Sequence, residues 1–311
     1  MLSCKQNVRK RNKGMKIHLS STAFRGKDFE EVWNSCLETA SGYGFELGIQ
    51  LHNSENESLV RTLAEKQIPL SIHAPLLQER NWNLAVKNPE EVFSAMEQNV
   101  QFFRSAGVTE TVFHGGVMAD FSPEAFGHGK SYHECMRSVY REELTLFPGK
   151  VYNRDFTDLA EYRERQVLLQ ENLALLRKRF PDMHFSLEND FPAYGSMNML
   201  FRDMVKLSHP LCLDTGHLWV SCHLLKRDFH KEVELAAESG LVRMCHFHES
   251  IYNSSIPPEQ WGDGHRELSI RNPDLDLGRV LRTLARGGCQ LFVFEFSQIT
   301  AEDLAIFHSY L

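Results

Sequence analysis

The sequence has 311 residues, 42% of them hydrophobic and 24% charged, and its 34 Lys and Arg against 41 Asp and Glu give a net charge of −7. This composition excludes a disordered or collagen-like chain and suits one large globular domain or two small ones. The acidic balance argues against a broadly basic nucleic-acid surface. No run of 18 apolar residues is present and residues 1–14 lack the apolar stretch of a secretory signal, so we expect a cytoplasmic protein with no membrane partner.

From Met15 onward, apolar runs alternate with helical patterns. Residues 1–14 are basic and polar, and we expect a disordered basic tail there, or an upstream start codon with Met15 as the natural first residue. The apolar runs predict eight strands, at 15–20, 45–51, 69–74, 110–115, 183–189, 210–216, 242–250 and 290–297. The segments between them predict helices at 27–40, 56–67, 88–106, 158–180, 225–239, 274–286 and 301–310.

Eight strands alternating with helices predict an α/β fold in which residues 15–311 form a single (β/α)₈ TIM barrel, because each parallel strand needs a crossover helix to return the chain. A doubly wound open sheet would give the same alternation, and the strand-end residues described below favour the barrel. One interval is longer than the rest, since roughly 70 residues separate the fourth and fifth strands. We expect an aromatic-rich insertion of roughly 40 residues, at about 117–157, that packs beside the barrel mouth.

The seven cysteines are an odd number without a CxxC pair, which argues against a disulfide framework and against thiolate zinc. A metal would therefore need other ligands, and the chain has fifteen histidines. Six strands end on a residue that can bind metal: His73, His114, Glu188, Asp214, His246 and Glu295. Because all strands of a parallel barrel open on one face, these side chains would converge there.

Each of these residues alone is explained well enough as a hydrogen-bonded structural residue or a helix cap. Six in one pocket are harder to explain in this way, because buried carboxylates and imidazoles need partners or a cation. Two local patterns add to them: Asp214 and His217 lie three apart just past a strand, and Asp263 and His265 alternate in a loop. Histidine and carboxylate without cysteine suit catalytic zinc, or manganese or iron, better than structural zinc.

Nine short motifs follow one another from residue 15 to 297: KIHLS, SIHAPL, NWNLA, VFHGG, SLEND, LCLDTGHLW, CHFHES, DGHREL and FVFEFS. In this order they resemble the xylose-isomerase-like TIM-barrel superfamily, most closely its endonuclease IV branch, the family 2 abasic-site endonucleases. The resemblance implies up to three divalent metal ions, with zinc as the first candidate. It assigns His73, His114 and Glu188 to the first metal, Glu188, Asp214, His246 and Glu295 to the second, and His217, Asp263 and His265 to the third.

The resemblance implies a phosphoesterase in which a metal-bound water attacks phosphorus in line. The sequence departs from that branch in three motifs. Leu76 replaces an aromatic residue that probes the abasic gap, and the loop LHNSENES has no Arg or aromatic residue to enter a duplex. LSIRNP replaces the glycine-rich GxG that follows the DxH motif. The motifs therefore support phosphoester chemistry better than they support DNA as the substrate.

A sugar or sugar-phosphate isomerase or epimerase of the same superfamily is the alternative, because Glu188, Asp214, His246 and Glu295 also resemble its single-metal quartet. There the two glutamates, which we take as the catalytic candidates, would exchange a proton at a carbon beside a metal-polarised carbonyl. The other five ligand candidates would then bind substrate hydroxyls. A barrel that binds without catalysis is a third hypothesis. His248, on the same side of its strand as His246, would orient a ligand or touch the substrate, and His52 is expected in a loop.

Overall fold

The computed structural model describes residues 14–52, 55, 57–77, 80–126 and 129–311, so the predicted tail lies, apart from Gly14, outside the described residues. The eight strands are β1 (Lys16–Ser20), β2 (Glu46–Leu51), β3 (Leu70–Ala74), β4 (Glu110–Phe113), β5 (His184–Glu188), β6 (Leu211–Asp214), β7 (Val242–His246) and β8 (Leu291–Phe294). All are parallel, and pairing of β8 with β1 closes them into a barrel in sequence order. The predicted (β/α)₈ barrel is confirmed, and the open sheet is not formed.

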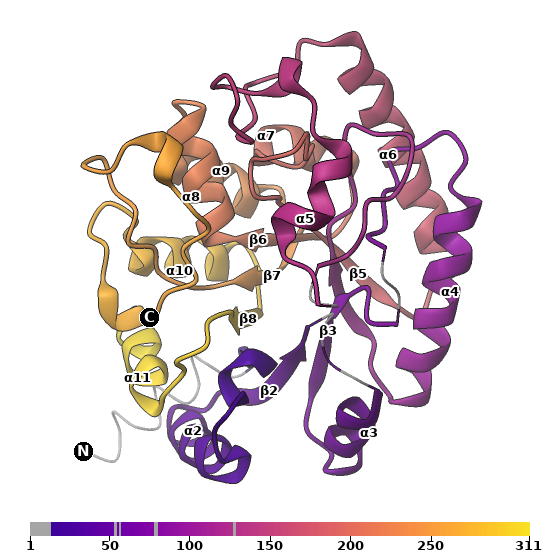
Figure 1. Ribbon diagram of the computed structural model, residues 1–311. Helices are drawn as coiled ribbons and strands as arrows, with labels where there is room; N and C mark the ends of the chain where they lie inside the picture. The colour runs from indigo at the N-terminus through magenta and orange to yellow at the C-terminus, as the bar shows by residue number, and fades with distance from the viewer. Residues whose placement is uncertain (1–13, 53–54, 56, 78–79, 127–128) are drawn as a thin grey trace.

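Helices surround the barrel on the outside (Figure 1). The α-helices are α2 (Phe29–Tyr43), α3 (Glu57–Glu65), α4 (Glu90–Ser105), α5 (Tyr132–Met136), α6 (Ala160–Arg179), α7 (Phe201–Met204), α8 (Thr215–Leu224), α9 (Phe229–Glu238), α10 (Leu277–Arg286) and α11 (Ala301–Ser309). Short 3₁₀ helices are η1 (Ser21–Phe24), η2 (Arg137–Val139), η3 (Glu142–Leu144), η4 (Val205–Leu207), η5 (Pro258–Gln260) and η6 (Leu268–Ile270). Each predicted helical range contains a helix. The sequence pattern missed α8, because nearly every position of that helix is buried and no amphipathic period marks it.

Two apolar layers hold the barrel together. Strand residues that face outward pack with the helices in the main core, for example Phe113, Leu187 and Leu213. The alternate residues fill the interior as a separate cluster of Val112, Cys212, Met244, Leu291 and Val293. Both faces are therefore buried, which is why the strands are continuous apolar runs in the sequence. The six described cysteines are buried and unpaired.

The interior layer also positions the strand-end residues. Side chains two apart on a strand point the same way. His114 therefore follows the inward-facing Val112, Asp214 follows Cys212, and in the same manner His246 follows Met244 and Glu295 follows Val293. The alternation that fills the barrel thus carries ligand-type residues onto its carboxyl end, at the mouth.

The segment between β4 and α6 covers this mouth, and Figure 1 shows α5 lying across the strand ends. Its own small core joins Val117, Met136 and Val139 to Ala193 and Tyr194 of the loop after β5. Isolated bridges, Val117 with Ser196 and Tyr152 with Ala193, tie the two segments together. The segment therefore packs beside the mouth, while its status as an insertion remains a prediction.

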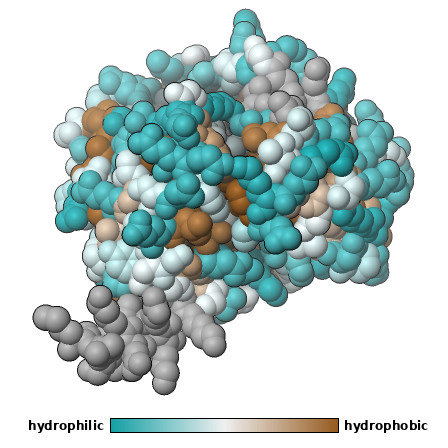
Figure 2. Space-filling model, turned by 90° about the horizontal axis from the view of Figure 1, so that it is seen from below, coloured by the Kyte–Doolittle hydropathy of each residue, from teal (hydrophilic) through white to brown (hydrophobic). Residues whose placement is uncertain are grey.

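The outer surface is mainly hydrophilic. Seen from below, hydrophobic side chains lie in small separate groups among hydrophilic ones (Figure 2). The large hydrophobic residues that are exposed come from distant parts of the chain: Leu37, Phe121, Val167, Leu175, Ile251, Ile270 and Leu311. Among the helices of the described residues, none has both the length and the apolar character needed to cross a membrane.

Candidate active site

The strand-end residues predicted as ligands meet at the mouth of the barrel. His73 lies in β3, Glu188, Asp214 and His246 are the last residues of their strands, and His114 and Glu295 directly follow β4 and β8. Two groups of possible ligand atoms, each within 4.8 Å of one another, coincide with the first two predicted metal sets: His73, His114 and Glu188, and Glu188, Asp214, His246 and Glu295. Glu188 belongs to both groups and lies at their centre.

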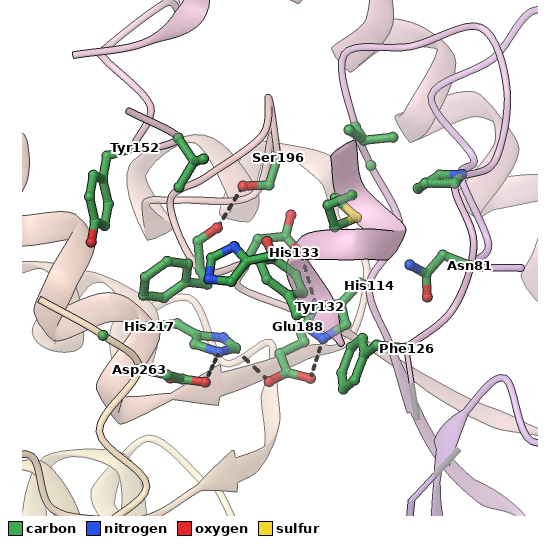
Figure 3. Close-up of a pocket in the computed structure, with 18 of the residues that line it drawn as sticks. Asn81, His114, Phe126, Tyr132, His133, Tyr152, Glu188, Ser196, His217 and Asp263 are labelled. Atoms are coloured by element: carbon green, nitrogen blue, oxygen red, sulfur yellow. Dashed lines mark hydrogen bonds and ion pairs between the residues drawn. The ribbon is translucent and has the colours of Figure 1, made fainter. Parts of the chain in front are cut away.

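Nitrogen and carboxylate oxygen atoms are in direct contact in these groups. His246 Nδ1 lies 2.9 Å from Glu188 Oε1, 2.6 Å from Glu295 Oε2 and 3.7 Å from Asp214 Oδ2. On the other side of Glu188, its Oε2 is 3.1 Å from His73 Nε2 and 3.7 Å from His114 Nε2. Figure 3 shows Glu188 between His114 and His217 on the floor of the pocket.

The third predicted set, His217, Asp263 and His265, lies beside the first two. Asp263 Oδ2 is 3.1 Å from His217 Nε2 and 3.2 Å from His265 Nδ1. Among the described residues, however, the groups within 4.8 Å combine these side chains differently. They are Asp214 with His217 and His265, and His248 with Asp263 and His265. His248 therefore joins the site, with its Nε2 atom 3.1 Å from Asp214 Oδ2.

The start of α8 lets the loop that carries Asp263 approach. Asp214 caps the helix, and its side chain accepts a hydrogen bond from the backbone N–H of His217 at 2.7 Å. A Cβ atom on Gly216 would lie 2.4 Å from the backbone oxygen of Asp263 and 2.4 Å from His248 Cε1. Only glycine at this position allows the loop and His248 to lie so close.

Two further residues at the site were missing from the predicted ligand set. Asp190 Oδ1 is 2.8 Å from His114 Nδ1, so it fixes the orientation of that ring. Its place two residues after Glu188 was the available signal, because alternation points both toward the mouth. His52 stacks on His73 at 5.5 Å between ring centroids, and its Nδ1 lies 3.6 Å from Glu295 Oε1.

Without a metal, the imidazoles and carboxylates of this cluster stabilise each other's charged forms. Burial raises the pKa of Glu188, but the imidazoles of His246, His114 and His73 outweigh burial and hold this pKa well below its usual range. Burial lowers the pKa of His217, but Asp214, Asp263 and Glu188 raise it well above the ordinary value. Protons on the imidazoles thus neutralise the carboxylates, in the positions where a divalent cation would compete with them.

The donor set fits a divalent metal. Buried atoms without a hydrogen-bond partner in the described part of the chain include Glu188 Oε2, His246 Nε2, Asp263 Oδ1, His265 Nε2 and Glu295 Oε2. Although Glu295 Oε2 is 2.6 Å from His246 Nδ1, it has no aligned hydrogen bond. Most buried polar atoms are paired, so such a concentration of unpaired nitrogen and oxygen atoms is suited to a cation. Zinc, manganese and iron all accept this ligand chemistry.

Above the ligands lies a cavity of about 410 Å³, a size typical of small-molecule sites. Its floor contains His73, His114, Glu188, His217, Asp263, His265 and Glu295. Its walls are largely apolar and aromatic, from Phe126, Tyr132, Met136, Val151, Tyr152, Phe191 and Trp261. Figure 3 shows Tyr132 and His133 of α5 above Glu188 and His114. No lysine or arginine is among the described residues that line it.

No protein-family model and no curated protein matches the sequence. The structure is similar to a D-tagatose 3-epimerase-like protein, at 14% identity over 95% of both chains and a TM-score of 0.51. It is similar to the TTHB071 protein from Thermus thermophilus, soaked with ZnCl₂, at 16% identity over 95% of this chain and 98% of the other, TM-score 0.54. A xylose isomerase domain protein from Planctomyces limnophilus matches at 12% identity over 94% and 93%, TM-score 0.52. The chain therefore has the fold of the xylose-isomerase-like TIM-barrel proteins.

Proposed function

We propose that the protein is a divalent-metal-dependent isomerase or epimerase that moves a proton at a carbon next to a carbonyl group, in a sugar-like substrate. One observation carries the proposal: Glu188, Asp214, His246 and Glu295 offer four ligand atoms within 4.8 Å of one another at the mouth of the barrel. Both glutamates also line the cavity, where a substrate would touch them. The names of the epimerase-like and xylose isomerase domain structures support the same chemistry.

The two glutamates are suited to exchange protons with a substrate. Each has an Oε2 atom without a hydrogen-bond partner in the described part of the chain. Burial raises the pKa of Glu295, but His246 and His265 outweigh it, so this carboxylate is ionised, like that of Glu188. A bound divalent ion would polarise the carbonyl of the substrate.

One glutamate would take the proton from the carbon beside this carbonyl, while the C–H electron pair forms a C=C bond and the C=O electron pair moves onto the carbonyl oxygen. In isomerisation, the proton of the neighbouring hydroxyl group would pass to the former carbonyl oxygen, and the same glutamate would return its proton to the former carbonyl carbon. In epimerisation, the second glutamate would take this hydroxyl proton and deliver it to the opposite face of the carbon, and the first glutamate would return its proton to the hydroxyl oxygen. His246, which contacts both carboxylates, keeps them in position.

A phosphoesterase, the first expectation from the sequence, is the second candidate. The trio of His73, His114 and Glu188 favours it, because this trio gives the site more ligands than one ion requires. The cavity walls favour the isomerase. Phosphate recognition commonly uses Arg or Lys, and the described lining has neither.

Solvent deuterium separates the two candidates. The protein loaded with Mn²⁺ or Zn²⁺ is incubated in D₂O with a panel of ketoses and aldoses, and NMR follows deuterium at the carbons beside the carbonyl. A parallel assay offers bis(p-nitrophenyl) phosphate and abasic-site DNA. We expect deuterium incorporation that Glu295→Gln abolishes, and no phosphoester cleavage. Cleavage without exchange in any sugar would contradict the proposal and support the phosphoesterase.

A further inference from the structure

The wall of the cavity opposite the ligands has a chemistry that a simple sugar does not use. We propose that the substrate carries an apolar, ring-sized group, aryl or branched alkyl, which packs against this wall while its hydroxy-carbonyl end meets the floor. The proposal deepens the proposed function and rests on it. The wall is defined here by the partly exposed side chains of Phe126, Tyr132, Val151, Tyr152 and Phe191.

The rings of the wall form a continuous surface that reaches the floor. Phe126 and Tyr132 meet edge to face at 5.9 Å between ring centroids, and Tyr132 and Phe191 at 6.3 Å. Phe191 in turn lies edge to face with His217, at 6.1 Å. Edge-to-face rings leave faces and edges on which another ring can pack. A group attached close to the reacting carbons would therefore reach this surface directly.

Most polar groups near the wall are already used by the protein. Hydrogen bonds to backbone oxygens occupy the amide nitrogens of Asn81 and Asn83 and the hydroxyls of Tyr152 and Ser196. The hydroxyl of Tyr132 has no such partner in the described part of the chain, and it could serve one substrate oxygen. A sugar buried here would leave several hydroxyl groups unpaired, which is unfavourable. An apolar group makes no hydrogen bonds with water, so it would lose none on entering the cavity.

The charged side chains available in the cavity lining narrow the class of substrate further. Among the described residues that line the cavity, the permanently cationic side chains lysine and arginine are missing. The imidazole nearest the wall, His133, already contacts the Tyr194 hydroxyl through Nδ1 at 2.9 Å, so a phosphate or carboxylate there would be poorly compensated. The substrate we infer is therefore uncharged at its outer end. It is an oxygen-rich hydroxy-carbonyl compound that bears an apolar substituent.

Three metal-chelating probes that differ only at their outer end test this inference. Acetohydroxamate, phenylacetohydroxamate and phosphoglycolohydroxamate imitate the hydroxy-carbonyl end, and calorimetry measures their binding to the protein loaded with Mn²⁺ or Zn²⁺. We expect phenylacetohydroxamate to bind at least about 10-fold more tightly than acetohydroxamate, because its ring is transferred from water to the apolar wall. We expect no gain from the phosphate.

Variants assign the gain to the wall. Phe191→Ala should reduce the preference for phenylacetohydroxamate to less than about threefold. Phe126→Ala is a second test, should Phe191→Ala fold poorly. Phe121→Ala is the matched control, because Phe121 is 47% exposed and lies outside the cavity lining. It should keep the full preference.

The outcomes separate this inference from the function on which it rests. Equal binding of acetohydroxamate and phenylacetohydroxamate, or tightest binding of the phosphate probe, would overturn the apolar-substrate inference and leave the metal-dependent chemistry intact. Failure of all three probes to bind the metal-loaded protein would mean that the floor does not present a chelatable metal, and would overturn both.

Discussion

Histidine occurs in two layers inside the barrel, with His18 in the lower one and the strand-end histidines in the upper one, and the two layers behave differently. In the lower layer, His18 Nδ1 is 2.8 Å from the hydroxyl of Ser71, and burial together with Lys16 lowers the pKa of His18 to about 3. Two residues after Ser71 in β3, His73 Nε2 lies 3.1 Å from Glu188 Oε2. The difference shows what carboxylates contribute: a buried imidazole beside a hydroxyl stays neutral and structural, whereas imidazoles among carboxylates form a site that attracts protons or metal.

The largest effect should follow the loss of the central carboxylate. Glu188→Gln keeps the shape of the side chain but removes the charge shared by both ligand groups. We expect activity to fall by about 100- to 10,000-fold and the metal content to drop, with an unchanged circular dichroism spectrum, because barrel stability lies in the packed core. Glu46→Gln, at the opposite end of the barrel in β2, is the control and should keep activity and metal. Full activity of Glu188→Gln would mean that the two layers do not differ in function.

Metal removal should reveal the charge difference through its pH dependence. In the metal-free protein, the folded-state pKa values of His217 and His246 are raised, despite burial, by their acidic neighbours. Their contribution to stability is therefore complete below about pH 6.5 and is lost as the pH rises through the folded-state pKa values. Metal needs neutral imidazoles, so it binds more tightly over the same rise.

Thermal unfolding with and without metal measures this linkage. At free metal 100-fold above Kd, the stabilisation should be about 2.7 kcal/mol. The gain at a fixed metal concentration should increase from pH 6 to pH 8, because the raised folded-state pKa values keep His217 and His246 protonated above their ordinary pKa of about 6.5, and metal must displace these protons. A gain that decreases over this range would show that protons and metal do not share these ligands.

A smaller effect is expected from the residue that orients His114. Asp190→Asn should retain the fold and weaken metal binding by about 10- to 100-fold, because the amide no longer holds the ring with a charge. Competition with a metallochromic chelator measures the affinity. Asp158→Asn is the control, since this side chain is 77% exposed and lies outside the cavity lining. Equal affinities of both variants would make Asp190 dispensable to the site.

The last effect concerns the lower layer, is absent at neutral pH and is visible only in acid. The folded-state pKa of His18, about 3, lies below its unfolded value, so the unfolded chain binds more protons between about pH 3 and 6.5, and stability falls as the pH falls through this window. His18→Asn should make this slope shallower by up to about 1.4 kcal/mol per pH unit. Urea unfolding from pH 7 to 4 checks it, with exposed His184→Asn as the control. Identical slopes would place His18 in contact with water.

The strand-end residues could be predicted from the sequence because alternation is local. Once the strands and their parallel order were expected, the positions of His114, Asp214 and His246 followed from the pleat. The same rule would have found Asp190. Helix α8 was not predictable in this way, since burial on all sides removes its period.

The wall of the cavity could not be predicted, because it depends on contacts between distant segments. Tyr132 meets Phe191 only when the segment after β4 packs on the loop after β5, and no periodicity encodes that contact. The wall is also what favours the isomerase over the phosphoesterase. The quartet of Glu188, Asp214, His246 and Glu295 resembles both groups of enzymes, so the sequence alone left the choice open.

Anomalous diffraction tests the central claim most directly. Crystals grown with Zn²⁺ or Mn²⁺ are measured on both sides of the absorption edge of the metal. We predict a peak at the mouth of the barrel, about 2.0–2.2 Å from ligand atoms of Glu188, Asp214, His246 and Glu295, as for zinc bound by nitrogen and oxygen ligands. Anomalous peaks confined to surface residues, with the mouth free of metal at saturating concentration, would contradict it.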